Sequence, residues 1–203
     1  MKISNDILYV GVNDHDIDLF EGHYIVPEGM AYNSYVVKGE KTAVMDSVDG
    51  HFTDEWIGKV KEAAGAPDYL VIQHMEPDHS SSITHFVKAF PDAKIISSAK
   101  AFTMMKNFFG TDFADKQVVV GENDTLELGE HTLTFVTAPM VHWPEVIVSF
   151  DSTTKEESFL ATVKVPCGTK AIVSLPAGEA ETVWYGEERL QSVYRNGKIT
   201  VEL

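Results

Sequence analysis

Four potential metal ligands fall within six consecutive residues, in the segment His74-Met75-Glu76-Pro77-Asp78-His79. Residues 69–72, just before it, form an apolar run that is typical of a strand buried on both faces. A loop at the end of such a strand can direct several side chains toward one point. The cluster therefore predicts a metal site, with a solvated acidic loop as the alternative interpretation.

The kinds of ligand narrow the choice of metal. The segment has no cysteine, and imidazole combined with carboxylate suits iron, manganese, zinc or cobalt. One histidine with two carboxylates supplies two negative charges, which favours ferric iron and can bridge or flank two metals in redox chemistry. A hydrolytic zinc loop more often uses neutral histidines, which leave the metal a stronger Lewis acid.

His142 is a second candidate ligand, because it lies between Pro139 and Pro144 in a rigid loop that follows an expected strand. The alternative interpretation is a turn histidine packed on Trp143. The remaining histidines are expected on the surface or in the core: His15, His23, His51, His85 and His131.

The elements that would position these residues mix hairpins with strand–helix–strand units. A hairpin is expected over residues 35–45, and a helix that begins at Thr53 as N-cap and ends at Gly65. Helices are also expected at 80–89 and 99–109, and strands at 69–72, 94–96, 118–120, 125–128, 131–138 and 146–150. This alternation indicates an α/β layered fold. After residue 155 the pattern predicts only strands, with hairpins over 162–175 and 192–201.

Composition limits the function further. The chain has 203 residues, with 31 acidic and 16 basic side chains, and this balance argues against nucleic-acid or anionic-membrane partners. The single cysteine, Cys167, excludes an internal disulfide and fits a reducing, cytoplasmic setting. No membrane span and no signal peptide are expected. Of the formal charge of −15, residues 1–155 carry almost all, which predicts a first domain over 1–155 and a β-rich tail over 156–203.

The motifs resemble those of flavodiiron proteins, also called A-type flavoproteins. The resemblance rests on residues 74–80 and 138–145, is supported by residues 11–22 and 29–35, and covers about residues 5–153. It implies a metallo-β-lactamase-like αββα sandwich with a diiron centre, followed in the family by a flavodoxin-like domain that holds FMN. It also implies reduction of O2 to water or NO to N2O, with electrons that pass through the flavin, often from rubredoxin.

Carried over by position, the resemblance implies that His74, Glu76 and His142 ligate one iron. Asp78 would ligate the other iron, with His79 beside it or in its shell. The family's bridging aspartate falls near Ala161, yet no aspartate follows Asp151 and no histidine follows His142. We therefore expect at most one well-held metal ion, a sandwich incomplete in its second half, and an all-β C-terminal tail.

Three functions stay open at this point. The first is a flavodiiron-type oxidoreductase, impaired because two ligands and the FMN domain are missing, that takes electrons from a flavodoxin- or rubredoxin-type donor. The second is a mononuclear metallo-hydrolase of the metallo-β-lactamase superfamily, and the third a non-catalytic truncated or fused remnant. A head-to-tail homodimer is a further expectation from the family.

Overall fold

The computed structural model describes residues 3–153 and, beyond them, six strand segments at 159–161, 172–176, 184–185, 188–189, 192–195 and 198–202. The chain divides into two compact units, Met1–Thr162 and Val163–Leu203. The candidate metal ligands all lie in the first unit.

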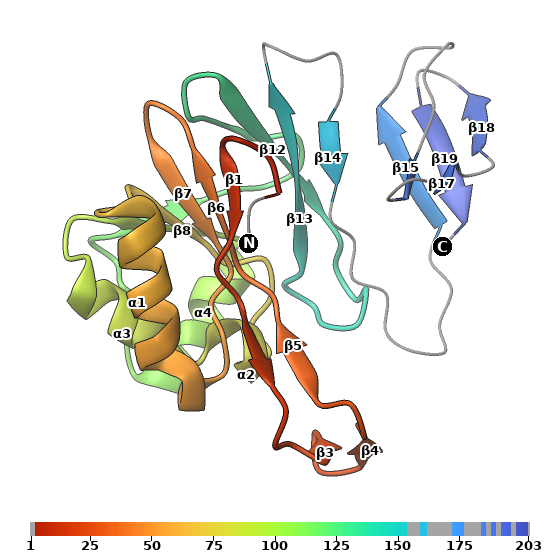
Figure 1. The fold of residues 1–203 in the computed structure, drawn as a ribbon. Helices are drawn as coiled ribbons and strands as arrows, with labels where there is room; N and C mark the ends of the chain where they lie inside the picture. Colours follow the sequence, from red (N-terminus) through yellow and green to blue (C-terminus); the bar gives the residue numbers. More distant parts are fainter. Residues whose placement is uncertain are drawn as a thin grey trace. The chain divides into compact units, whose positions relative to one another are not determined.

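A six-stranded sheet forms the centre of the first unit. Its strand order is β1 (Ile7–Tyr9), β6 (Tyr35–Lys38), β7 (Thr42–Met45), β8 (Tyr69–Val71), β9 (Lys94–Ser97) and β10 (Gln117–Val119). The pairs β1–β6 and β6–β7 are antiparallel, whereas β7, β8, β9 and β10 are parallel. Parallel neighbours need crossover connections, and α1 (Thr53–Ala64), α3 (Ile83–Ala89) and α4 (Ala99–Phe109) lie in them on one face of the sheet (Figure 1).

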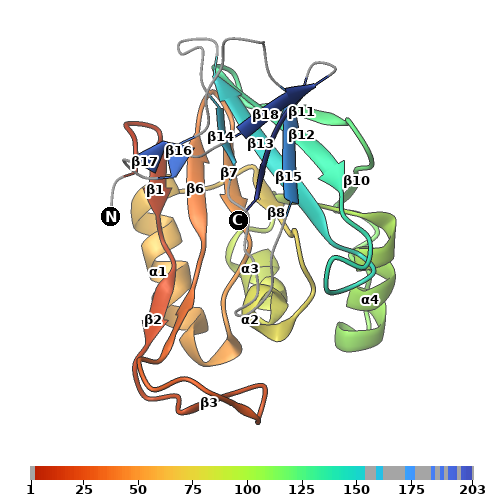
Figure 2. The same ribbon diagram turned by 90° about the vertical axis from the view of Figure 1, so that its right-hand side faces the viewer.

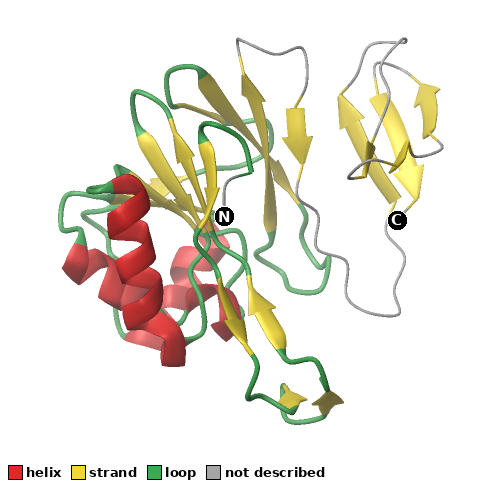
Figure 3. Cartoon of the chain, viewed as in Figure 1, coloured by secondary structure: helices red, strands yellow, loops and turns green. Residues whose placement is uncertain are grey.

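A second, antiparallel sheet covers the other face of the first. Its strands run in the order β11 (Thr125–Glu127), β12 (His131–Thr137), β13 (Ile147–Thr153) and β14 (Phe159–Ala161). Figure 3 shows the resulting layers, with helices on one side and this second sheet on the other. Within residues 3–153 no helix covers the outer face of the second sheet, so the expected sandwich with a shortened second half is confirmed.

Two apolar clusters join these layers. Alternate residues of the first sheet point to opposite faces: Val36 and Val44 pack with Trp56 and Phe86 beneath the helices. Their neighbours on the strands, such as Val37 and Ala43, pack against Leu133 and Phe135 of the second sheet. The second cluster fixes the position of the second sheet, which carries one of the candidate ligands.

An arm of short strands extends from β1 and β6. It consists of β2 (Val12–Asp14) paired with β5 (Met30–Tyr32), and of β3 (Leu19–Phe20) paired with β4 (Tyr24–Ile25) at its tip. Figures 1 and 2 show the arm reaching beyond the sheet.

The structure corrects two local predictions. Helix α1 begins at Thr53, and its N-cap is Phe52, which offers no capping side chain. A 3-10 turn, η1 (Gly50–Phe52), precedes the helix and is capped by Asp49, so the Thr53 hydroxyl instead donates to the Gly50 carbonyl. The helix expected at 80–89 is two helices, α2 (Pro77–Ser80) and α3.

The second unit is described only as strands. One sheet has the order β15 (Ile172–Pro176), β19 (Lys198–Glu202) and β18 (Ser192–Arg195), and β16 (Trp184–Tyr185) pairs with β17 (Glu188–Arg189). The antiparallel pairing of β18 with β19 confirms the hairpin expected over 192–201. The expected strand at 162–165 and its following turn lie outside the described residues.

Candidate metal centre

Three of the candidate ligands meet at one point. His74 and Glu76 lie in the loop between β8 and α2, and His142 lies in the connection from β12 to β13. Each offers one ligand atom, and these atoms lie within 4.8 Å of one another. Glu76 Oε2 is 3.0 Å from His74 Nε2 and 2.9 Å from His142 Nε2. Only His142 is substantially exposed, at 40% of its side chain, so the cluster opens to solvent on that side.

The loop that carries His74 and Glu76 is held by its own sequence. Pro77 occupies the first turn of α2, where its missing N–H is not needed. Within the loop, the Ser80 hydroxyl donates to the Met75 carbonyl at 2.9 Å. Met75 itself is fully buried beneath the helices. The flanking residues therefore anchor the loop and leave the two ligands facing the second sheet.

His142 is placed by an unusual backbone conformation. Its φ is 74°, in the left-handed region that costs a non-glycine residue about 1–2 kcal/mol. Met140 N–H donates to the Trp143 carbonyl at 2.9 Å and closes the turn, and the Trp143 ring stands edge-on to His74 at 5.1 Å. Strain of this kind persists where surrounding contacts hold it and is concentrated at functional sites.

Asp78 and His79 lie next to this cluster but outside it. Both are buried, and His79 Nε2 is 3.6 Å from Asp78 Oδ2. The His79 ring centroid is 5.4 Å from that of His74. The structure thus brings His74, Glu76 and His142 together and places the other two predicted ligands beside them, and metal ligation by all five stays a prediction.

Two carboxylates that the sequence analysis did not assign stand behind the histidines. Glu145 Oε1 is 2.8 Å from His74 Nδ1, and Asp46 Oδ2 is 3.2 Å from His79 Nδ1. The sequence does contain a clue to the role of Asp46. It directly follows β7, a strand of the parallel set, and the carboxyl ends of such strands meet at the edge of the sheet where sites form.

The carboxylates of the cluster stabilise positive charge on the His74 ring. Burial acts to lower the pKa of His74, but hydrogen bonds to Glu145 and Glu76 outweigh it and raise this pKa to about 9. The hydrogen bond from His74 holds the pKa of Glu76 far below its usual range. The pKa of Glu21, in the arm, is raised chiefly by its hydrogen bond with the Glu76 side chain.

The residues fit a divalent metal ion. Two imidazole nitrogens and a carboxylate oxygen converge, and Glu76 Oε1 is buried with no N–H donor facing it within the described residues. A buried carboxylate oxygen is costly unless a donor or a cation compensates it. The donor set suits iron, manganese, cobalt or zinc, as predicted for this loop.

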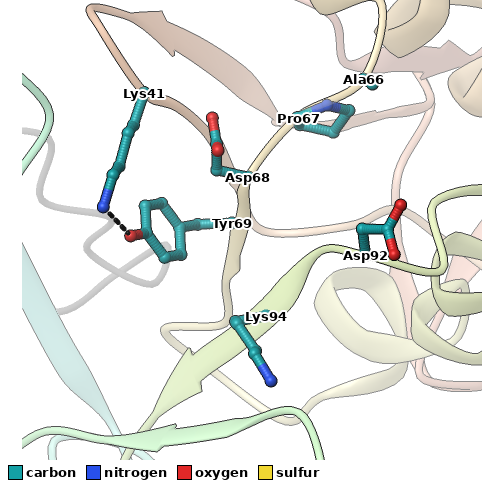
Figure 4. A pocket seen from close by; sticks show the side chains of 7 residues that line it. All are labelled: Lys41, Ala66, Pro67, Asp68, Tyr69, Asp92 and Lys94. Carbon is teal, nitrogen blue, oxygen red and sulfur yellow. Dashed lines mark hydrogen bonds between the residues drawn. The ribbon is translucent and has the colours of Figure 1, made fainter.

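A small cavity elsewhere offers no comparable chemistry. It has a volume of about 230 Å³ and lies where β8 and β9 begin, whereas the metal cluster follows the opposite end of β8. Figure 4 shows Lys41 turned to Tyr69, to whose hydroxyl it donates at 3.1 Å. Lys94 donates to the Asp115 carbonyl, and Asp68 accepts from the Thr42 N–H. These polar groups are already engaged with the protein itself.

His131 was expected on the surface or in the core, and the structure places it in the core. Its Nδ1 is 2.7 Å from Asp151 Oδ2 on the neighbouring strand. The pair belongs to the second sheet and contributes nothing to the metal cluster.

Comparisons with known proteins show which family the chain resembles. The family model described as ODP family beta lactamase matches residues 30–157. The flavo-diiron protein FprA2 of Clostridium acetobutylicum is 34% identical over 148 residues, which are 71% of this chain and 37% of that protein. A nitric oxide reductase of Moorella thermoacetica is 33% identical over 154 residues, 74% of this chain and 38% of its own length.

A solved structure shows the same architecture. Rubredoxin:oxygen oxidoreductase from Desulfovibrio gigas superposes with a TM-score of 0.72 and 32% identity, over 79% of this chain and 40% of that one. The chain therefore spans about two fifths of the length of these relatives. No helix among the described residues is long and apolar enough to cross a lipid bilayer.

Proposed function

Because this chain belongs to the ODP family beta lactamase proteins and its relatives are flavodiiron proteins, we propose that it is the iron-binding part of an O2 or NO reductase. The observation that carries the proposal is the convergence of two imidazoles and one carboxylate on a single point. The names of two relatives, a nitric oxide reductase and a rubredoxin-oxygen oxidoreductase, support both substrates equally.

In this proposal His74, Glu76 and His142 hold one iron firmly. Asp78 and His79 line a second, weaker position, because Ala161 lies near the place where the resemblance puts the bridging aspartate. A bound iron would supply one-electron redox chemistry toward a small diatomic gas. The exposed side of His142 leaves a path by which such a molecule reaches the cluster.

The protein's own groups keep the site ready for the metal ion. The buried carboxylate of Glu76 retains its negative charge, since its pKa is held low by His74. The indole of Trp143 packs edge-on against His74 and excludes water from that side of the ring. These contacts would let the ligands bind an ion with little rearrangement.

Electron supply belongs to the same proposal. A flavodoxin- or rubredoxin-type donor would deliver the electrons, as the name of the rubredoxin-oxygen oxidoreductase relative suggests. A flavodoxin-type donor would carry these electrons on FMN. A reducing cytoplasmic setting and a homodimer are further parts of the proposal.

Metal analysis and gas consumption test this function in sequence. After anaerobic loading with ferrous iron, the full chain is expected to retain about one iron, as three preformed protein ligands allow. Consumption of O2 or NO is then measured with a reduced flavodoxin or rubredoxin as donor. Loss of iron in His142→Ala but not in His51→Ala, whose side chain is 93% exposed, would support the assigned ligands.

Two outcomes would contradict the proposal. Retention of no iron by the wild-type chain would remove the site altogether. Zinc-dependent hydrolysis of a phosphoester or thioester, without gas consumption by the iron form, would favour a mononuclear hydrolase instead.

A further inference from the structure

Glu145 is buried at the meeting point of three parts of the first unit. It lies in the connection from β12 to β13 and is 2% exposed. Its Oε1 accepts from Met75 N–H at 2.9 Å and faces His74 Nδ1 at 2.8 Å. Its carbonyl accepts from the Ser98 hydroxyl at 2.8 Å, and Ser98 in turn caps helix α4. The Glu145 carboxylate is therefore fixed in place from both its side chain and its backbone.

The position of this carboxylate determines how His74 presents its ring. An ionised carboxylate only accepts hydrogen bonds, so the ring nitrogen that faces Glu145 must be the one that carries the proton. Nδ1 is then protonated toward Glu145. Nε2, which lies 3.0 Å from the Glu76 carboxylate and also carries a proton when no ion is bound, is the nitrogen that would exchange its proton for a metal ion. Metal-binding histidines commonly have such a carboxylate on the other ring nitrogen, which fixes the tautomer and raises the basicity of the ligand.

A role in folding alone does not explain why this residue is charged. Glu145 Oε2 is buried and has no hydrogen-bond partner among the described residues. A neutral side chain could accept from Met75 N–H without burying a charge, and buried charges are costly unless a cation compensates them. The group that compensates this charge is the His74 ring, 2.8 Å from Oε1, so the Glu145 carboxylate acts on His74.

We propose that Glu145 is the positioning residue of the metal centre: it holds His74 through Nδ1 so that Nε2 faces the ion shared with Glu76 and His142. The inference rests on the proposed metal site and adds a residue outside the ligand set. It also explains how the second sheet, which supplies His142, simultaneously orients a ligand in the loop after β8.

Zinc is the probe for the test, because it has no redox chemistry and keeps the protein diamagnetic for NMR. Zinc affinity of the full chain is measured by competition with a chelator for wild type, Glu145→Gln and Glu145→Ala. Loss of such an outer partner typically weakens metal binding about 10–100-fold. We expect the lower end for Glu145→Gln, which keeps an acceptor oxygen, and the upper end for Glu145→Ala.

The control is Glu122→Ala. Glu122 likewise accepts a backbone hydrogen bond, from Thr137 N–H at 2.8 Å, at the end of β12 and outside the metal cluster. Its removal is expected to leave zinc affinity within about twofold of wild type, since the hydrogen bonds described for its side chain both come from Thr137, which is not a candidate ligand. If Glu145→Ala fails to fold, shown by loss of its cooperative thermal transition, Glu145→Gln decides the affinity.

The tautomer of His74 distinguishes a positioning role of Glu145 from a purely structural one. Substitution of a residue that only supports the fold would leave the proton on the same ring nitrogen. In nitrogen-15 spectra of the zinc form, wild-type His74 should show a proton on Nδ1 that exchanges slowly with water. This proton should stay protected in Glu122→Ala and exchange fast in Glu145→Ala. Equal affinity and equal protection in wild type and both Glu145 variants would overturn the inference.

Failure of the proposed function gives a different pattern. If the wild-type chain takes up neither iron nor zinc, the metal site is refuted, and the same spectra of the metal-free protein still decide the role of Glu145. Protection of the His74 Nδ1 proton that does not depend on Glu145 would then overturn the inference as well.

Discussion

Removal of His142 should abolish most of the stability that the protein gains from metal. His142 supplies one of three converging ligand atoms, and its side chain is 40% exposed, so His142→Ala leaves little new cavity. The residue has a left-handed φ of 74°, which histidine adopts several-fold more often than alanine, a preference of about 1 kcal/mol or less. The stability of the metal-free protein is therefore expected to change by less than about 1 kcal/mol.

The size of the effect follows from binding linkage. At a free metal concentration of 100 times Kd, binding stabilises the wild-type fold by about 2.7 kcal/mol. Loss of an outer partner of a metal ligand lowers metal affinity by about 10–100-fold. For loss of the ligand itself we therefore take a decrease in metal affinity of about 100-fold. At the same metal concentration the variant would then gain only about 0.4 kcal/mol.

Thermal unfolding with and without metal measures this difference. A loss of about 2.3 kcal/mol corresponds to a melting temperature roughly 5–9 °C lower in the presence of metal for a chain of this size. Wild type, His142→Ala and the control His51→Ala are compared in excess chelator and in zinc. An equal zinc-induced shift in all three proteins would refute the assignment of His142 as a ligand.

Three other substitutions test the fold. Gly39→Ala should lower the free energy of unfolding in urea by about 1–3 kcal/mol, because its Cβ would lie 1.9 Å from the carbonyl oxygen of Leu128, in the turn between β11 and β12. Gly58→Ala, in open space within α1, should raise the free energy of unfolding by about 0.5–1 kcal/mol. An unchanged free energy of unfolding in Gly39→Ala would contradict this close contact. Burial raises the pKa of Asp151 from its ordinary 3.8, against the opposing hydrogen bond from His131, so its contribution is full below pH 3.8 and is lost as pH rises through the higher folded value. Asp151→Asn, which cannot ionise, should therefore gain stability relative to wild type between pH 4 and pH 7, and an unchanged difference between the two proteins would contradict this.

The ligands closest in sequence were the part of the site most accessible to prediction. The residues from His74 to His79 combine chemistry-bearing side chains with a buried strand before them, and both signals are local. His142 enters the cluster across 66 residues, and only its resemblance to a family motif linked it to Glu76 before the structure did. The layered fold was likewise predictable, because hairpin and strand–helix–strand patterns are visible along the chain.

What escaped prediction depends on distant parts of the chain. Asp46 and Glu145 are single acidic residues whose roles arise only when another segment places a histidine beside them. The wrong N-cap at Thr53 has a similar cause. A threonine before a helical pattern is a good cap on local grounds, but the turn capped by Asp49 leads directly into the helix. At such positions the contacts of the preceding turn, and not the propensity of the single residue, determine where the helix begins.

Gln73 ties the two sheets into one scaffold around the candidate metal site. Its backbone N–H donates to Asp46 Oδ1 at 2.7 Å, at the strand end that also places His79. Its carbonyl accepts from Ile147 N–H at 3.1 Å, and its Oε1 accepts from Ser149 N–H at 3.0 Å, both on β13. One residue thus ties the parallel strand edge to the strand that leaves the His142 loop.

This connection limits how far the ligands can separate. Hydrogen bonds at Gln73 hold β13 against the loop that carries His74, and Glu145, two residues before that strand, contacts the His74 ring. The distance between His142 and Glu76 is therefore set by the packing of two sheets rather than by the ion. A site assembled in this way loses little conformational entropy on binding, so its affinity depends mainly on which ligands it contains. The metal content of this chain is then a direct measure of its ligand set.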